Sequence, residues 1–159
     1  LKSLTRLTAE EMMQDFEVNA LGAALAVQSL APALRKNETS ASVVLFSSVA
    51  ADQGFKLHTS MGMAKGAVRG LTLSLAAELA PKIRVNAIAP SLTQTDMAEG
   101  MLANEKLAEA ISKMHAMERL GTPEEMAAMI AFLLSEDSSW ITGQIFGVDG
   151  GRSTLRIKN

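Results

Sequence analysis

Three short apolar stretches divide the chain and predict the strands of a buried sheet. Residues 43–46 (VVLF) form a continuous apolar run, residues 83–88 (IRVNAI) alternate, and residues 144–148 (QIFGV) form the last stretch. Short apolar runs of this kind are typical of strands that are covered on both faces. Because helical patterns separate the three stretches, we expect an α/β fold with a parallel sheet, helices on both faces and right-handed crossovers.

Helices are predicted wherever apolar residues recur at steps of three and four. A capping box at Thr8–Glu11 begins the first helix, and a second capping box at Thr122–Glu125, with proline at the first helical position, begins the last. The predicted helices cover residues 9–34, residues 59–79, a short stretch from residue 97, residues 105–117 and residues 126–134.

The composition fits one ordinary domain and excludes several kinds of site. The chain has 159 residues, of which 48% are hydrophobic and 20% are charged, and its formal net charge is −2. The charges are interspersed, so we expect no nucleic-acid partner. Without cysteine, and with His58 and His115 far apart, we expect no metal site. The sequence predicts neither a membrane span nor a signal peptide, so a cytoplasmic location is expected.

Residues 43–79 combine a predicted strand and the helix that follows it with polar side chains that could bind a ligand. Ser47 and Ser48 follow the first strand directly, and Lys65 lies on the helix that comes next. Side chains at the carboxyl ends of parallel strands face the crevice where open α/β sheets bind ligands. A structural interpretation stays open for each residue: the serines are common capping residues, and a helix lysine is ordinarily solvated. Asn19, a poor helix former within residues 9–34, has a structural hydrogen bond as its simplest role.

Five motifs, in this order, carry a resemblance to a known family. They are VNALG with Asn19, LFSSVA with Ser48, AKGAV with Lys65, the stretch RVNAIAPSLTQTDM, and the final stretch from ERLGTPEE to GQIFGVDGG. With these motifs and their spacing, the chain resembles the short-chain dehydrogenase/reductase family over essentially its whole length.

The resemblance implies a Rossmann-type, doubly wound parallel sheet (an α/β/α sandwich) of which this chain is the carboxyl-terminal half only. Residues 1–159 would then form a single, partial NAD(P)-binding domain without the glycine-rich amino-terminal half. The implied reaction is hydride transfer between NAD or NADP and a small carbonyl or alcohol substrate. The implied catalytic residues are Asn19, Ser48 and Lys65. The implied cofactor-binding residues are Asn19, Lys65, Pro90, Ser91, Thr93 and Thr95.

The chain departs from the family pattern at the proton donor. The family's tyrosine, four residues before the lysine, is Met61 here, and the chain contains no tyrosine. A thioether has no proton to give, and the loss of a positioned general acid typically costs about 10²- to 10⁴-fold in rate. The activity is therefore open, and the alternative is a non-catalytic relative that binds a nucleotide or another subunit. Ser91 also stands where the family usually has glycine.

His58 is a second candidate for the proton donor. It lies seven residues before Lys65, which is the spacing of the tyrosine in the bacterial enoyl-reductase branch of the family. An imidazole can donate a proton near neutral pH. The simpler interpretation is a partly exposed loop histidine, and APSLTQTDM is more similar to the carbonyl-reductase branches.

Self-association is expected from the two long helices, 9–34 and 59–79. They carry small residues and apolar stripes beyond what one face of a sheet covers. In the family these helices form the common interface, so the resemblance implies a homodimer or homotetramer. A fragment whose other half comes from a different chain is a further possibility.

Overall fold

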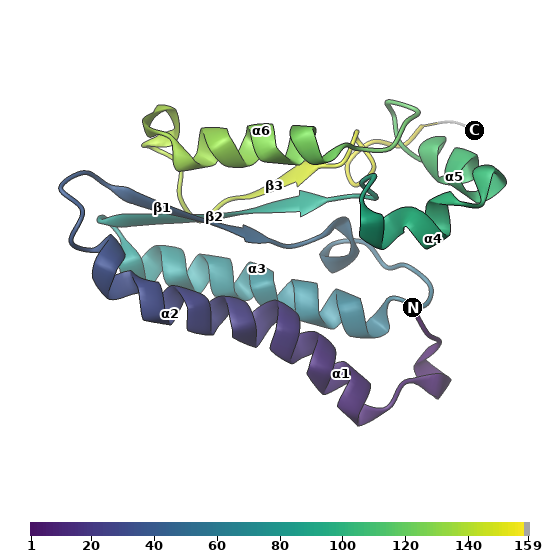
Figure 1. Cartoon of the computed structure of the whole chain (residues 1–159), viewed down its shortest axis with the longest axis horizontal. Helices are drawn as coiled ribbons and strands as arrows, with labels where there is room; N and C mark the ends of the chain where they lie inside the picture. The colour runs from purple at the N-terminus through teal and green to yellow at the C-terminus, as the bar shows by residue number, and fades with distance from the viewer. Residues whose placement is uncertain (158–159) are drawn as a thin grey trace.

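The computed structural model describes residues 1–157 and contains a three-stranded parallel sheet. The strands are β1 (Ala41–Phe46), β2 (Ile83–Pro90) and β3 (Ile145–Val148), in the spatial order β1-β2-β3 (Figure 1). The predicted parallel sheet is confirmed, with strand ends that differ from the prediction by one or two residues.

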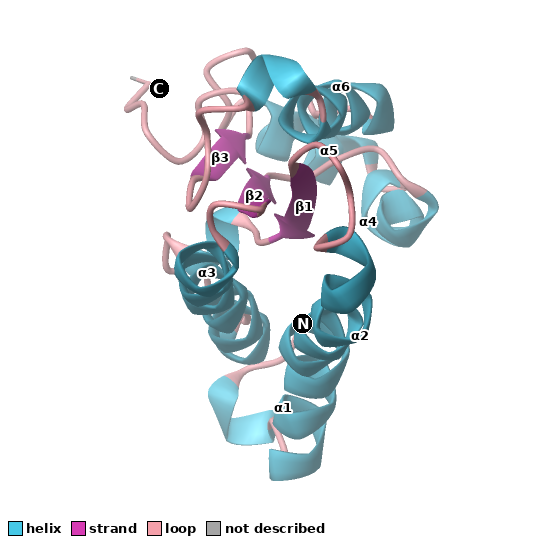
Figure 2. Cartoon of the chain, turned by 90° about the vertical axis from the view of Figure 1, so that its left-hand side faces the viewer, coloured by secondary structure: helices cyan, strands magenta, loops and turns pink. Residues whose placement is uncertain are grey.

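Helices cover both faces of this sheet, as predicted. Helices α2 (Gly22–Leu34) and α3 (Thr59–Leu79) lie on one face, and α6 (Pro123–Leu134) lies on the other (Figures 1 and 2). Strand β2 is central, and every residue from Ile83 to Ala89 is buried. A strand covered on both faces and paired on both edges has no solvent-facing side, which explains why even its polar residues, Arg84 and Asn86, are buried.

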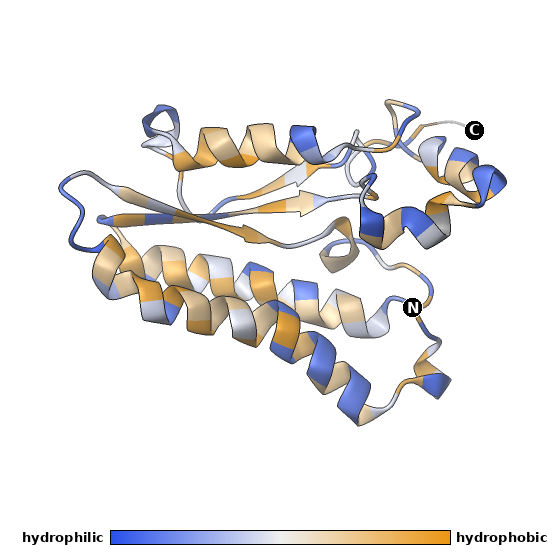
Figure 3. Cartoon of the chain, viewed as in Figure 1, coloured by the Kyte–Doolittle hydropathy of each residue, from blue (hydrophilic) through white to orange (hydrophobic). Residues whose placement is uncertain are grey.

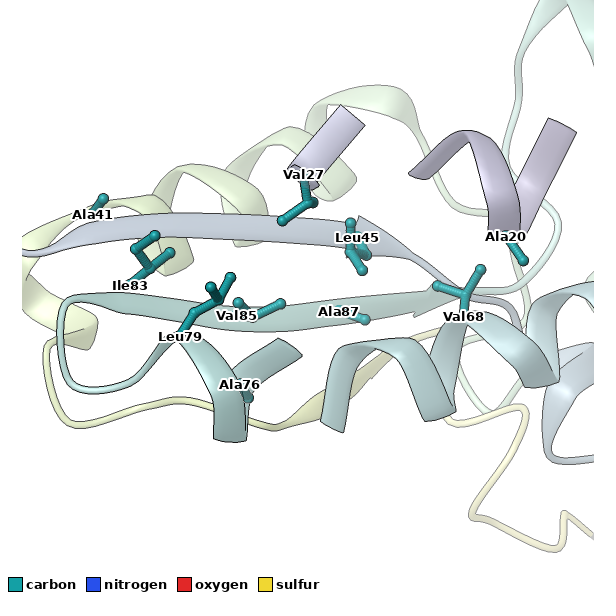
Figure 4. Packing of buried hydrophobic residues seen from close by; sticks show 10 residues of the cluster. All are labelled: Ala20, Val27, Ala41, Leu45, Val68, Ala76, Leu79, Ile83, Val85 and Ala87. Atoms are coloured by element: carbon teal, nitrogen blue, oxygen red, sulfur yellow. The ribbon is translucent and has the colours of Figure 1, made fainter. Parts of the chain in front are cut away.

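The alternation of β2 divides the core into two parts. Ile83, Val85 and Ala87 belong to the cluster on the side of α3, together with residues from α2 and β1 (Figure 4). Ile88 packs on the other side with Met126 and Leu133 of α6. The first cluster contains Ala20, Val27, Ala41, Leu45, Val68, Ala76, Leu79, Ile83, Val85 and Ala87.

Arg84 and Asn86 are polar residues on the α6 side of β2, and both are buried. The guanidinium of Arg84 donates to the carbonyls of Leu133 (3.0 Å) and Ser135 (3.0 Å) and to the hydroxyl of Ser138 (2.8 Å). The last carbonyls of a helix have no partners within the helix, and a cation is favourable at that end. Arg84 therefore fastens the carboxyl end of α6 to the sheet.

The first predicted helix changes its hydrogen-bond pattern in the middle. Helix α1 (Ala9–Phe16) continues through a π-helical segment, Glu17–Leu21, into α2. The amide of Gly22 bonds to the carbonyl of Glu17, and a Cβ at residue 22 would lie 3.3 Å from that oxygen. The wider turn contains Asn19, and π-helical turns often occur at functional sites.

The segment between β2 and α6 contains short helices, and one prediction there is wrong. Helix α4 spans Glu99–Leu102, and α5 spans Glu105–Ser112 rather than residues 105–117. The chain turns after Ser112 because His115 bonds back to the carbonyl of Ile111 and Glu118 has a positive φ of 50°. The shorter 3₁₀ helices are Leu4–Arg6, Val49–Ala51, Asp96–Ala98 and Glu136–Ser138.

Helix α2 is largely apolar along its length (Figure 3), and several leucines on it and just before it are not covered by the sheet. Leu21, Leu25 and Leu30 are 42%, 53% and 56% exposed. Within residues 1–157, no helix combines the length and the apolar character needed to cross a membrane. In the same residues, no group of three His, Cys, Asp or Glu side chains is arranged to hold a metal ion.

The start of α6 generates a prediction about acid stability. Glu125 accepts a hydrogen bond from the amide of Thr122 (3.0 Å) and pairs with the guanidinium of Arg119. The Arg119 hydrogen bond and then the Thr122 amide lower the pKa of Glu125 to about 2. The pKa of a glutamate in an unfolded chain is about 4.3. The unfolded chain therefore binds this proton more tightly than the folded chain does, and protonation favours unfolding. The stabilisation is therefore complete above about pH 5 and is lost as the pH falls towards 2.

We expect Glu125→Gln to lower the melting temperature by a constant amount above about pH 5, with the difference shrinking as the pH falls towards the folded pKa. Glu124→Gln, at the neighbouring exposed position, is the matched control and should show no such pH-dependent difference. Thermal unfolding followed by circular dichroism across this pH range measures both. A Glu125→Gln difference that stays constant down to pH 2 contradicts the role of the ion pair.

Candidate active site

Two reciprocal hydrogen bonds join the end of β1 to helix α3. The ammonium of Lys65 donates to the carbonyl of Phe46 (3.0 Å), and the hydroxyl of Ser47 donates to the carbonyl of Lys65 (3.1 Å). Ser47 is buried, whereas Lys65 is half-buried. These two bonds form a clasp that holds Lys65 against the end of β1 and Ser47.

Ser48 has a structural role that leaves its hydroxyl hydrogen free for other use. Its backbone is extended, and its Oγ accepts a hydrogen bond from the amide of Ala50 (3.1 Å) at the start of the 3₁₀ turn Val49–Ala51. A serine hydroxyl can accept one bond and still donate another. The capping role that the sequence left open is present, and it is compatible with binding a substrate oxygen.

Helix α3 approaches the loop after Ser48 very closely. A Cβ at Gly62 would lie 3.2 Å from the carbonyl oxygen of Ala50, so only glycine fits there without a shift. Met61 lies next to this contact and one helical turn before Lys65, and it is partly buried. Residue 61 is thus a partly buried thioether with no proton to donate.

Asn19 is connected to the beginning of α3 through Asp15. Its side-chain amide donates to the carbonyl of Asp15 (2.8 Å), and the Asp15 carboxylate accepts a hydrogen bond from Ser60 (2.5 Å). Ser60 is buried and immediately precedes Met61. The π-helical turn and α3 are therefore fixed relative to each other at the position of Met61.

The environment of Lys65 changes its electrostatics. Burial lowers the pKa of the Lys65 ammonium because the charged form loses solvent. Its hydrogen-bond partner, the Phe46 carbonyl, is neutral, and the ion pairs within residues 1–157 do not include it. A half-buried cation without a carboxylate partner is available to a polar ligand at this edge of the sheet.

The structure places His58 just before α3 rather than on the helical face of Lys65. His58 has non-helical backbone angles and is the residue that precedes Thr59, the first residue of the helix. Its Nδ1 lies 2.8 Å from the carbonyl of Lys56, and its ring packs at 5.5 Å from the ring of Phe55. The structure therefore gives His58 the local contacts of a partly exposed loop histidine.

The expected cofactor-binding loop follows β2 at the same edge of the sheet. Pro90 ends the strand. The hydroxyl of Thr93 donates to the carbonyl of Ser91 (3.1 Å), and the backbone of Thr93 forms an isolated parallel β-bridge with Gly121. Thr95 is exposed and precedes the 3₁₀ turn Asp96–Ala98.

His115 is the residue of interest that sequence reasoning missed. It is 1% exposed, and its Nε2 lies 2.8 Å from the hydroxyl of Ser91. Both residues line a cavity of about 310 Å³ beside the carboxyl ends of β2 and β3. Sequence reasoning missed this pair because it placed His115 in a predicted helix, residues 105–117, and nothing in the sequence links that stretch to Ser91.

A family model described as enoyl-(acyl carrier protein) reductase matches residues 1–153 of the chain. The chain belongs to the short-chain dehydrogenase/reductase family. Among curated relatives, it is 40% identical over 150 residues to short-chain dehydrogenase/reductase SDRA of Arabidopsis thaliana, covering 91% of this chain and 57% of the relative. It is 38% identical over 147 residues to tropinone reductase-like 3 of Erythroxylum coca, covering 91% and 56%.

A solved dehydrogenase structure shows the same fold. The crystal structure of a putative 2-deoxy-D-gluconate 3-dehydrogenase from Agrobacterium tumefaciens, with bound NADP, matches with a TM-score of 0.88 and 31% identity. The match covers 95% of this chain and 62% of the other. The chain thus spans between half and two thirds of the length of the relatives that it matches.

The close approach at Gly62 can be tested with a matched pair of glycines in α3. A Cβ at Gly66 would have nothing within 4 Å, so Gly66→Ala should stabilise the helix by about 0.5–1 kcal/mol. Gly62→Ala should lose this gain, because its Cβ must displace the Ala50 carbonyl at a cost of about 1–3 kcal/mol. Urea unfolding of the two variants gives the comparison, and equal stabilisation by both would show that α3 does not press against the Ser48 loop.

Proposed function

We propose that this chain carries the substrate-side half of an NAD(P)-dependent oxidoreductase that acts on a small carbonyl or alcohol. The observation that supports this most is the clasp of Ser47, Phe46 and Lys65, because it holds the lysine at the end of the strand that leads into Ser48, and residue 61 takes no part in it. In this proposal residues 1–159 are the carboxyl-terminal part of a Rossmann-type domain whose glycine-rich half would supply the phosphate site.

The cofactor in this proposal is NAD or NADP. Lys65, Asn19 and the loop from Pro90 to Thr95, including Ser91 and Thr93, are the residues proposed to face it. The related Agrobacterium dehydrogenase with bound NADP supports this assignment. When bound, the nicotinamide supplies the hydride, whereas the residues of this chain position the reacting groups.

Each proposed residue has a role that follows from its contacts. The Ser48 oxygen accepts a hydrogen bond from the Ala50 amide, so the Ser48 hydroxyl can still donate its hydrogen to the substrate oxygen and orient it. Lys65 presents a half-buried ammonium to hydroxyl groups at the strand ends. Asn19 holds the π-helical turn next to α3. Met61 contributes shape and no proton, so slow turnover is expected of the protein.

The second candidate function is that of a non-catalytic relative that binds dinucleotide or another subunit. Met61 is the observation that favours it, because the packing around residue 61 is intact while the acid is absent. The two functions differ in one outcome: an enzyme oxidises NADPH in the presence of a carbonyl compound, and a binding protein does not.

Restoring the acid provides the test. In the full translation product of the gene, we expect Met61→Tyr to raise carbonyl-dependent NADPH oxidation by about 10²- to 10⁴-fold, the range of a positioned general acid. Absorbance of NADPH with a panel of aldehydes and ketones measures this. Met61→Phe is the matched control, since it adds an aromatic ring without the hydroxyl and should give no gain.

His58→Ala in the same protein tests the competing donor. Turnover that is normal with Met61 present and falls about 100-fold or more on losing His58 would assign the acid to histidine and contradict the proposal. Turnover that Met61→Tyr does not raise would show that Ser48 and Lys65 do not line a working pocket.

We further propose that the chain forms a homodimer or homotetramer through α2 and α3. A surface groove of about 650 Å³ lies between these helices and is lined largely by apolar residues, including Leu25 and Leu75. Leu25 is 53% exposed, and a second copy of the same helices would cover it.

Sedimentation at micromolar concentration should therefore show a dimer or larger species. Leu25→Glu should shift the protein towards monomer, because it places a charge in the covered surface. Leu107→Glu on α5, where the leucine is 43% exposed, is the control and should leave the association unchanged. A monodisperse wild-type monomer would contradict the proposed interface.

A further inference from the structure

The protonation pattern of His115 follows from its two partners. Nδ1 lies 2.8 Å from the carbonyl oxygen of Ile111, and Nε2 lies 2.8 Å from the hydroxyl of Ser91. A backbone carbonyl can only accept, so Nδ1 carries the proton. In the neutral ring Nε2 then holds the lone pair, and it accepts a hydrogen bond from the Ser91 hydroxyl.

This arrangement has the three parts of an activated serine. A hydroxyl is bonded to the bare nitrogen of an imidazole, and a third group orients the imidazole through its other nitrogen. Here the third group is the Ile111 carbonyl. His115 is 1% exposed and cannot turn towards solvent, whereas Ser91 is partly exposed. The buried base is therefore fixed behind an accessible hydroxyl.

The serine faces an open cavity rather than packed protein. The cavity of about 310 Å³ is bounded by Ser91, His115 and the turn after β3, and its lining does not include Ser48, Met61 or Lys65. Gly150 has a positive φ of 59°, and a Cβ there would lie 3.5 Å from the Cβ of His115. The glycine turn thus lets the backbone pass closely over the histidine.

The walls of the cavity indicate which molecules fit. Its charged lining residues are already bonded: Arg119 pairs with Glu125, and the Asp149 carboxylate accepts from the amides of Gly151 (2.9 Å) and Ser153 (2.9 Å). The apolar lining residues are Leu92, Met117, Leu120, Met126 and Val148. An uncharged, mainly apolar molecule is therefore favoured over an anion or a cation.

We propose that Ser91 is a nucleophile that accepts the acyl group of small uncharged esters, with His115 as its general base. The Ser91 oxygen bonds to the acyl carbon while its proton passes to Nε2 of His115. The bond between the acyl carbon and the leaving oxygen then breaks, and the leaving oxygen takes the proton from Nε2. Water attacks the acyl-serine in the same way, giving the carboxylic acid and free Ser91. This step uses neither Ser48 nor Lys65, although Ser91 is also one of the residues proposed above to face the cofactor.

The direct test uses p-nitrophenyl acetate with the protein as it exists. Intact mass and peptide mapping should show one acetyl group on Ser91, and Ser91→Ala should abolish it. His115→Gln should slow acetylation about 100-fold, the lower range for loss of a general base. Ser74→Ala, at an exposed serine on α3, is the control and should react as wild type. Acetylation confined to lysines, or an unchanged rate in His115→Gln, would overturn the proposal.

A second measurement does not depend on the folding of a His115 variant. The chain has no cysteine, so Ser91→Cys and Ser74→Cys each introduce a single thiol. If His115 acts as a base, the thiol at residue 91 should react with iodoacetamide at least 10-fold faster at neutral pH than the freely exposed thiol at residue 74. A thiol at residue 91 that reacts no faster than the one at residue 74 would overturn the proposal by itself.

Discussion

The junction between β1 and α3 is the constraint on which the rest of the site depends. Lys65 donates to the last carbonyl of the strand, and Ser47 donates to the carbonyl of Lys65, so each element satisfies a polar group of the other. A buried polar group without a hydrogen-bond partner is costly, so these two bonds favour one alignment of β1 against α3. The same junction presses Gly62 against Ala50 and so fixes the loop that holds Ser48. The same contacts therefore stabilise the fold and position the candidate catalytic residues.

The junction does not depend on the side chain of residue 61. The clasp uses a serine hydroxyl, a lysine and two carbonyls, and Met61 takes no part in it. Asn19 bonds to the carbonyl of Asp15, whose carboxylate accepts a hydrogen bond from Ser60 at the start of α3. Membership of the short-chain dehydrogenase/reductase family accounts for the fold of this chain, whereas the proposed function is argued from its own side chains.

Local sequence signals predicted the fold well where local physics determines it. The apolar runs gave the three strands, and the capping boxes at Thr8 and Thr122 gave two helix starts. The early end of α5 could not be predicted, because the bond from His115 to the Ile111 carbonyl and the positive φ of Glu118 leave no mark on the spacing of apolar residues. Periodicity also could not distinguish the π-helical segment Glu17–Leu21 from an α-helix, because one wide turn is too short to show an apolar period of its own. At the site, topology predicted that Ser48 and Lys65 would face the same edge of the sheet, but it could not predict the clasp, because the clasp is made by Ser47 and two backbone carbonyls.

The titration of Lys65 tests the central claim most directly. Reductive methylation with carbon-13 formaldehyde gives each lysine a separate signal in nuclear magnetic resonance spectra, and Lys65→Arg identifies the signal of Lys65. Because burial at the junction disfavours its charged form, the Lys65 signal should titrate at a lower pH than those of the exposed lysines. Unfolding in urea should abolish this difference. A Lys65 signal that titrates together with the exposed lysines in the folded protein would contradict the account, because the side chain would then be in solvent instead of bound at the end of β1.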